Sequence, residues 1–363
     1  MSISGRLKQA REFAGYTLEK VAAFTGIDDS CINSYERGRA EPKFAQLSKL
    51  AEAYRVPISF FFEQSAEGVQ LVLWRNRPDN ESQIGAEFIQ LCRQYRQIEQ
   101  WAGDFPSRQL PPIDLSGERF GYSEAESLAN DARRNLGLGD RPGESLSTVL
   151  EEVYGVKIFY MDLGILGTAA CAKSKLFGEA ILLNSQCCRW RRNHDLAHEL
   201  FHLLTWERFG HTQGVCEPNP QEEKFATCFA GNLLLPYDTV KDALNKVSES
   251  SGGIALSRLD SVARQFDVSL ESLLWRMQFI YHWKDEQTRT YIDEAKEYVK
   301  QTERKDEFRP PLYPERYRAL AIQVFRKGEM SLGQLAKYLH ISRKEAQQYL
   351  CRDVDYEIPT SVA

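Results

Sequence analysis

The sequence has few histidines and no long apolar run, and both shortages narrow what the protein can be. Only six of its 363 residues are histidine, yet three of them lie within nine positions, at His194, His198 and His202. No stretch approaches the roughly 20 apolar residues that a membrane helix needs. The first residues also lack the apolar core of a signal peptide. We therefore expect a cytoplasmic protein with no membrane partner.

Cysteine pairs with the spacing of a metal site are also missing. The eight cysteines are scattered without a Cys-x-x-Cys motif, and we interpret the adjacent Cys187 and Cys188 as ordinary thiols. Their number fits a reducing compartment better than a disulfide framework. The formal net charge of −5 argues against a basic coat over the whole surface and leaves only a local basic patch for binding nucleic acid.

Loop and helix signals divide the chain into four parts. They predict an all-α helix-turn-helix domain over 1–66, a helical linker over 67–118, an α+β domain over 119–300 and a basic helical segment over 301–363. In the third part, the short apolar patterns GVKIFYMDLG and EAILLNS predict two strands before a histidine-rich helix. The expected fold class is therefore α+β and mostly helical, with one small sheet.

Residues 5–62 carry the pattern of a helix-turn-helix. Thr17 and Asp28 are each placed to cap a short helix, and Gly26 lies at the turn between the two helices. The segments GIDDSCINSYERGRAEP and LSKLAEAYRV together resemble the XRE, or Cro/repressor-like, helix-turn-helix family. The resemblance implies that the second helix enters the major groove of operator DNA.

The same resemblance assigns DNA contacts to five residues. The groove-facing residues would be Asp29, Ser30, Asn33 and Ser34, with Arg37 near the DNA backbone. Leu18 stands where the family usually has a polar Gln, and residues 1–64 hold nine Lys or Arg against eight Asp or Glu, a net charge of +1. That charge attracts DNA weakly. Either a homodimer on paired half-sites recovers the affinity, or the module docks only onto protein.

The stretch HDLAHELFHLL contains an HExxH arrangement. His198 and His202 are four positions apart, so on a helix both imidazoles leave the same face, as two ligands of one zinc ion must. Glu199 lies beside them, where a general base is needed. The alternative is a buried helix, marked by Leu196 and Leu200, that carries its histidines in the core.

A third ligand has to come from the next helix, PQEEKFATCFAGNLLLP. Glu223 shares a face with the small residues Ala226 and Ala230, so it can approach the histidine-rich helix closely. We therefore prefer Glu223 to Glu222, which lies off that face. The alternative for both glutamates is a solvated first helical turn, which the helix dipole favours.

Four further residues are candidates to support such a site. His194 lies one turn before His198; we expect it to pack, or to donate a hydrogen bond to a ligand, because a fourth protein ligand would close the catalytic position. Asp195 and His211 are candidates for the same supporting role, and Cys216 is a candidate redox-sensitive ligand.

The motifs HDLAHELFHLL and EEKFATCFAGNLLLP resemble the ImmA/IrrE family of zinc metallopeptidases, over residues 120–280. The resemblance implies a gluzincin-like pair of helices that binds Zn²⁺ through His198, His202 and Glu223, with Glu199 as the general base. It also implies proteolysis of a repressor or antitoxin-like protein, which relieves transcriptional repression under stress.

Two functions therefore compete. The first is a zinc endopeptidase with a DNA-binding module, in which the strand pattern EAILLNS forms an edge along which a peptide lies extended. The second is a non-enzymatic regulator or antitoxin that uses the peptidase-like domain as a sensor or a partner-binding scaffold. A third arrangement, in which the peptidase cuts its own helix-turn-helix domain, also stays open.

The last segment has the opposite charge to the chain as a whole. Residues 310–352 hold eight Lys or Arg and three Glu, a net charge of +5, and SLGQLAKYLHISRKEAQQYL predicts two short helices around a turn. The segment would contact nucleic acid, recognise the substrate or cap the peptidase domain.

Overall fold

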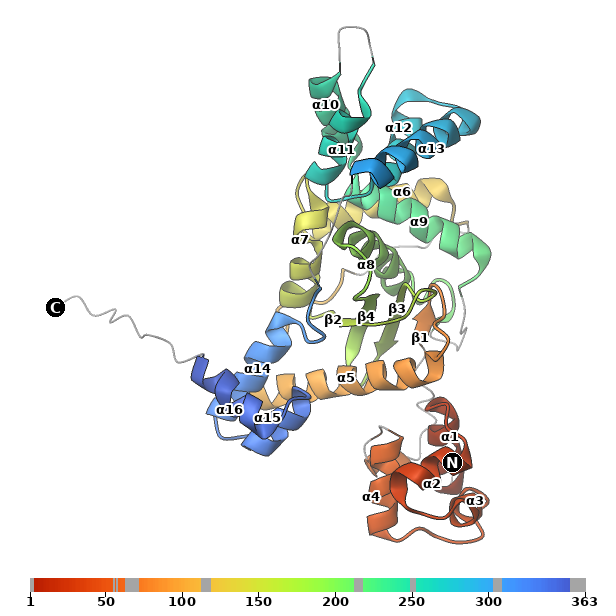
Figure 1. Ribbon diagram of the computed structural model, residues 1–363, viewed down its shortest axis with the longest axis vertical. Coiled ribbons are helices and arrows are strands. Elements are labelled where there is room, and N and C mark those ends of the chain that lie inside the picture. The colour runs from red at the N-terminus through yellow and green to blue at the C-terminus, as the bar shows by residue number, and fades with distance from the viewer. Residues whose placement is uncertain are drawn as a thin grey trace, which may run out of the picture.

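The computed structural model of the chain describes residues 3–54, 56, 58–62, 72–111, 119–211, 218–248, 253–302 and 309–352. It is mostly helical and has one four-stranded sheet near its centre (Figure 1). The predicted fold class is confirmed. Within these residues, no helix is both long enough and apolar enough to cross a membrane.

The N-terminal unit is built from short helices around a small core. Its elements are α1 (Ile3–Phe13), α2 (Leu18–Thr25), α3 (Asp29–Glu36), α4 (Phe44–Ala53) and the 3-10 turn η1 (Ile58–Phe61). The side chain of Thr17 accepts a hydrogen bond from Lys20 N at 3.3 Å, and that of Asp28 accepts one from Ser30 N at 3.0 Å. Both residues therefore cap the helices that they were predicted to cap. Gly26 ends α2 in the left-handed conformation, with φ of 67°.

The sheet has the strand order β1-β3-β4-β2. Its strands are β1 (Val72–Trp74), β2 (Lys157–Met161), β3 (Ala169–Ser174) and β4 (Gly178–Asn184). β3 pairs antiparallel with both β1 and β4, and β2 pairs parallel with β4. The EAILLNS strand, β4, is thus hydrogen-bonded on both sides. Its prediction as a peptide-binding edge is wrong, because β3 pairs with it on one side and β2 on the other.

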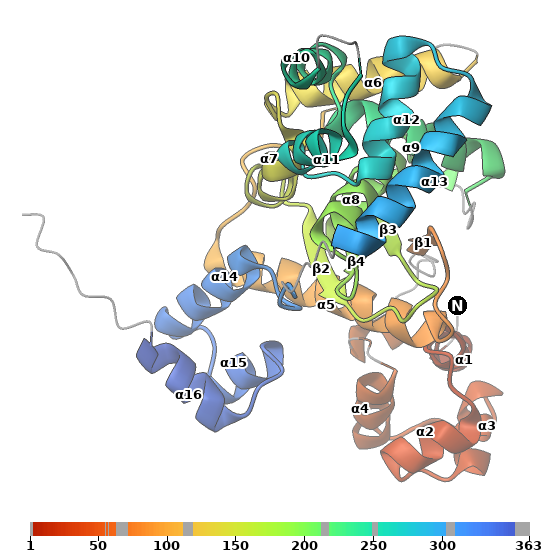
Figure 2. The same ribbon diagram turned by 45° about the horizontal axis from the view of Figure 1, so that its top comes forward.

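The sheet separates two hydrophobic cores, since successive side chains along a strand point to opposite faces. One face packs beneath α8 (Arg189–Leu204) and α9 (Pro220–Leu234), and its strand residues include Ala169, Cys171, Ile181 and Leu183. The other face packs on α5 (Glu81–Ala102) and α14 (Glu315–Arg326), and its strand residues include Phe159, Ala170, Ala172 and Leu182. The sheet is therefore the middle layer between the histidine-rich helix and α5 (Figure 2).

The remaining helices enclose α8 and α9 or extend from them. They are α6 (Tyr122–Asn135), α7 (Pro142–Thr148) with the π-helical turn η2 (Val149–Val153), α10 (Tyr237–Val247), α11 (Leu256–Gln265), α12 (Leu270–Tyr281) and α13 (Asp285–Thr302). Helices α6 and α10 to α12 gather on the side of α8 and α9 away from the sheet (Figure 1). The two central helices are consequently shielded from several directions.

The segment predicted as a helical linker is a structural part of the fold. It contributes β1 as well as the 22-residue helix α5. At the start of α5, Gly15 of the N-terminal unit comes so close that a Cβ atom on it would lie 2.7 Å from Ser82 Cβ. At the other end, Lys327 Nζ donates to Ala102 O at 2.6 Å. The second contact anchors α14, which is followed by α15 (Leu332–Tyr338) and α16 (Arg343–Arg352).

Candidate metal centre

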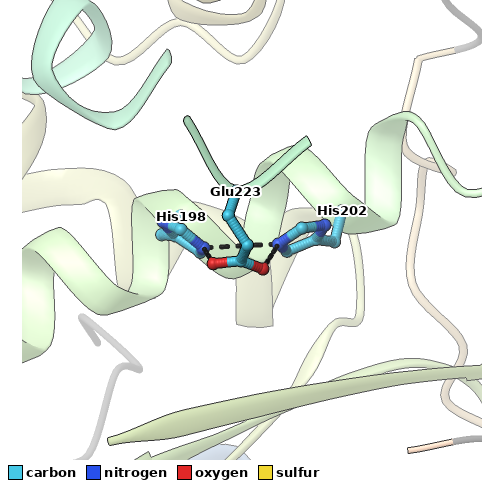
Figure 3. A group of neighbouring side chains, drawn as sticks. All are labelled: His198, His202 and Glu223. Atoms are coloured by element: carbon cyan, nitrogen blue, oxygen red, sulfur yellow. Dashed lines mark hydrogen bonds and ion pairs between the residues drawn. The ribbon is translucent and has the colours of Figure 1, made fainter. Parts of the chain in front are cut away.

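Helices α8 and α9 bring the three predicted ligands together. His198 and His202 leave one face of α8 with their Nε2 atoms 3.3 Å apart. Glu223, in the first turn of α9, places Oε2 3.1 Å from His198 Nε2 and Oε1 3.3 Å from His202 Nε2 (Figure 3). The side chain of Asn219 caps α9 by accepting hydrogen bonds from two backbone amides of that turn. The cap fixes where α9 begins, and thereby where Glu223 lies.

The donor atoms of this group fit a single zinc ion. All of them lie within 4.8 Å of one another, and two imidazoles with one carboxylate are a donor set of catalytic zinc sites. The two histidine side chains are 1% exposed, whereas that of Glu223 is 31% exposed, so the group opens to solvent on the Glu223 side. Burial alone would raise the pKa of Glu223, but its hydrogen bonds to the histidines outweigh burial and hold this pKa below its usual value.

Glu199 is a buried carboxylate beside the same group. It is 1% exposed, and within the part of the chain that the structure describes its oxygens meet no strong donor, but only the weakly donating thiol of Cys171 on β3. Burial raises its pKa to about 7. A buried carboxylate without a strong donor is costly, so these oxygens are placed to pair with a water or substrate atom that enters the site.

Glu222 faces the opposite side of His202. Its Oε1 atom lies 2.9 Å from His202 Nδ1 and 2.8 Å from His211 Nε2, and its side chain is fully buried. A carboxylate behind a histidine fixes the orientation of the ring and increases its basicity as a ligand. Glu222 is therefore not part of a solvated helical turn, and its position supports the preference for Glu223 as the third ligand.

These three side chains, His202, His211 and Glu222, also lie close enough to hold an ion of their own. They share His202 with the first group, which uses the other ring nitrogen, Nε2. We therefore interpret them as a hydrogen-bonded chain that orients His202. His211 thus takes part in the support of the site through its contact with Glu222.

His194 and Asp195 are oriented by an arginine that the sequence gave no reason to select. Arg75, which follows β1, donates through Nη1 to Asp195 Oδ1 and lies 3.4 Å from His194 Nδ1. Burial, with the nearby charge of Arg75, holds the pKa of His194 well below its usual value. The two residues thus tie α8 to β1. Cys216 lies outside the described residues.

The five predicted DNA-contacting residues lie on or directly after α3. Asp29, Ser30 and Arg37 are exposed, while Asn33 and Ser34 are half-buried. The opposite face of the helix is buried through Ile32 and Tyr35. The predicted set therefore occupies the outward side of the second helix of the helix-turn-helix.

Two family models match separate parts of the chain. Residues 7–61 match a helix-turn-helix model, and residues 151–278 match the IrrE N-terminal-like domain. The second match includes β2 to β4, α8 and α9, and hence all three candidate metal ligands, His198, His202 and Glu223. The chain therefore joins a helix-turn-helix module of the DNA-binding type to an IrrE-like domain, which has a metallopeptidase-type fold. Both parts agree with the two resemblances that the sequence predicted.

Two curated proteins are similar to the N-terminal module. The HTH-type transcriptional regulator ImmR of Bacillus subtilis (strain 168) is 37% identical over 60 residues, which are 16% of this chain and 47% of that protein. The HTH-type transcriptional regulator SutR of Escherichia coli (strain K12) is 36% identical over 59 residues, 16% of this chain and 33% of that protein. The chain thus spans half or less of the length of these relatives.

One solved structure, described as a Mycobacterium tuberculosis transcriptional regulator, aligns with 52% of this chain and 52% of its own at 14% identity. Its TM-score of 0.32 is too low to support a conclusion about the fold.

Proposed function

We propose that the protein is a zinc-dependent endopeptidase coupled to a DNA-binding module, and that it cleaves a repressor or antitoxin-like protein to control transcription. The observation that carries this proposal is the convergence of His198, His202 and Glu223 beside the buried carboxylate of Glu199. The match to the IrrE N-terminal-like domain over these residues supports the same reading.

The residues of the chain have distinct tasks in such a reaction. Zinc held by His198, His202 and Glu223 would polarise the scissile carbonyl and make the attacking water more acidic. Glu199 is placed to accept the proton of that water and to deliver it to the leaving amine. Glu222 keeps the His202 ring in place throughout.

The N-terminal module would bring this activity to DNA. We infer that α3 binds operator DNA through its outward side chains, with Asp29, Ser30, Asn33 and Ser34 toward the groove and Arg37 toward the backbone. A homodimer on paired half-sites would compensate for the low charge of the module. The two curated relatives are named as transcriptional regulators, which supports this role.

The decisive experiment co-expresses the chain with the products of neighbouring genes and looks for a cleavage product. We expect Glu199→Gln to lower cleavage at least 100-fold, because general-base catalysis contributes about 10²- to 10⁴-fold, while the variant keeps a full equivalent of zinc. Glu207→Gln, which changes an exposed glutamate near the end of α8, is the control and should cleave normally. Equal cleavage by Glu199→Gln would contradict the proposal and favour the non-enzymatic regulator.

A further inference from the structure

The C-terminal helices repeat the frame of the N-terminal helix-turn-helix. Residues 331–352 align with residues 17–38 without a gap, so that α15 and α16 correspond to α2 and α3. Ser331 caps α15 by accepting a hydrogen bond from the backbone three residues on, as Thr17 does for α2. The turn residues also correspond, since His340 has φ of 51° where Gly26 has 67°.

The second helix of each unit agrees as well. Ser342 Oγ accepts from Glu345 N at 3.2 Å at the start of α16, in the position where Asp28 caps α3. The helix before each pair ends in the same way, with a glycine N–H bonded to the carbonyl three residues back. The buried positions that correspond are Val21 and Leu335, Thr25 and Leu339, and Ile32 and Ala346. A shared frame of caps, turn and core indicates the same packing of the two helices.

The two units differ in the side chains that their second helices present. Where α3 carries Asp29, Ser30, Asn33 and Ser34, α16 carries Arg343, Lys344, Gln347 and Gln348, in that order. All four residues of α16 are exposed. Cationic and amide side chains thus replace an acidic residue and small polar ones at the positions that face the groove in a helix-turn-helix.

The outer face of α16 is available to a partner. The unit is attached through α14, whose Arg316 donates to the buried Glu99 of α5 at 2.8 Å. The Tyr317 side chain of α14 also donates to Tyr338 O of α15. Ala346 turns the inner side of α16 toward this unit, and α16 lies at its outer end in both views (Figures 1 and 2).

We propose that residues 315–352 form a second helix-turn-helix, which binds duplex DNA with α16 in the major groove. Arg343 and Lys344 have the charge to contact phosphates or the acceptor edge of guanine, and Gln347 and Gln348 can pair with adenine. The net charge of +5 over residues 310–352 is complementary to the DNA backbone, unlike the +1 of residues 1–64. This site is separate from α3 and from the metal centre.

The test measures binding of the full-length protein to a mixed-sequence 30-base-pair duplex by fluorescence anisotropy at several salt concentrations. We expect Arg343→Ala with Lys344→Ala to weaken binding about tenfold. The slope of log K against log salt should fall by roughly 1 to 2, since each lost phosphate contact removes about 0.9. The control, Lys296→Ala with Lys300→Ala, removes the same charge from exposed sites on α13 and should bind like the wild type.

Two further variants keep the result interpretable. The double variant Asn33→Ala with Ser34→Ala measures the contribution of α3 to DNA binding. A loss of affinity in this variant is assigned to α3 and leaves the test of α16 unaffected. If the double variant Arg343→Ala with Lys344→Ala melts at a lower temperature than the wild type, the single variant Lys344→Gln replaces it. We expect Lys344→Gln to reduce the slope of log K against log salt by about 0.9. An unchanged affinity and slope in both α16 variants would overturn the proposal. So would an equal loss in the α13 control, or α16-dependent binding of single-stranded RNA in preference to the duplex.

Discussion

Glu222 and Glu223 are neighbours in the sequence but face different nitrogen atoms of the same histidine. Glu223 reaches His202 Nε2 at 3.3 Å, and Glu222 reaches Nδ1 at 2.9 Å. The small residues on one face of α9 were enough to select Glu223 from the sequence. The role of Glu222 could not be seen there, because it depends on His211, whose position is set by the chain beyond the end of α8.

Removing Glu222 should weaken metal binding without removing a ligand. We expect Glu222→Ala to raise the dissociation constant for zinc about 10- to 100-fold, because the His202 ring loses the carboxylate that orients it. Competition with a chromophoric chelator measures this directly. Gln221→Ala alters the exposed neighbour and should leave the affinity unchanged; equal affinities for both variants would refute the role of Glu222.

Glu151 should make stability depend on pH in the direction opposite to an ordinary carboxylate. Burial raises its pKa from 4.5 to about 8, although it accepts a hydrogen bond from Tyr95 at 3.1 Å. The native state therefore holds a proton that the unfolded chain releases at lower pH, so this contribution to stability is full below pH 4.5 and is lost as the pH rises through about 8.

Thermal melts between pH 5 and pH 8 test this contribution. We expect Glu151→Gln to become more stable relative to the wild type as the pH rises, because the amide cannot lose a proton. Glu144→Gln changes an exposed glutamate of α7 and should follow the wild type. A constant difference between Glu151→Gln and the wild type over this range would show that Glu151 titrates normally.

The sequence predicted the helices, and the strands with bulky apolar side chains, better than it predicted the strands with small side chains or few residues. The caps at Thr17 and Asp28 and the strand patterns of β2 and β4 were all recognisable. β3 was missed because its sequence, AACAKS, lacks the β-branched and aromatic residues typical of strands. Its small side chains instead allow α8 to pack closely on the sheet. β1, with three residues, is too short for a periodic signal.

The link between β1 and α8 should contribute strongly to stability. Asp195 is 1% exposed and is paired with Arg75, with the more exposed Arg191 as its second partner. Arg75→Met should lower the free energy of unfolding by about 3 kcal/mol, because it removes the closer partner of a buried charge. Urea unfolding measures the change. Arg77→Met removes an exposed arginine paired with Glu81 and should cost less than about 1 kcal/mol; similar losses for the two variants would argue against the link.

At the scale of the whole molecule, the order of the modules was predictable and their attachment was not. The motifs at 17–38 and 194–236 identify the helix-turn-helix module and the IrrE-like domain, because the residues of each motif are close together in the sequence. The burial of Glu99 against Arg316 joins residues 217 positions apart, and no local pattern reveals it. The segment SLGQLAKYLHISRKEAQQYL was recognisable as two short helices around a turn, but the frame that it shares with residues 17–38 required the caps and turn conformations.

Helix α5 gives the molecule a fixed internal length. At about 1.5 Å per residue its 22 residues extend about 33 Å, close to the 34 Å of one turn of B-form DNA. The N-terminal unit contacts one end of this helix and the C-terminal unit the other. On a duplex selected for binding, inserting about 5 base pairs between the two contacted segments should weaken binding, because it turns them to opposite faces of the duplex. Inserting about 10 should weaken it as well, because the segments then lie about 34 Å farther apart than a spacer of fixed length can reach.

Equal affinity at every insertion length, measured by anisotropy, would mean that the two units bind DNA independently. Weaker binding at both insertion lengths would make α5 a ruler. The protein would then select its target by the distance between two short segments along the double helix as well as by their base sequence, and a single polypeptide would achieve the geometry that repressors usually reach by pairing two copies.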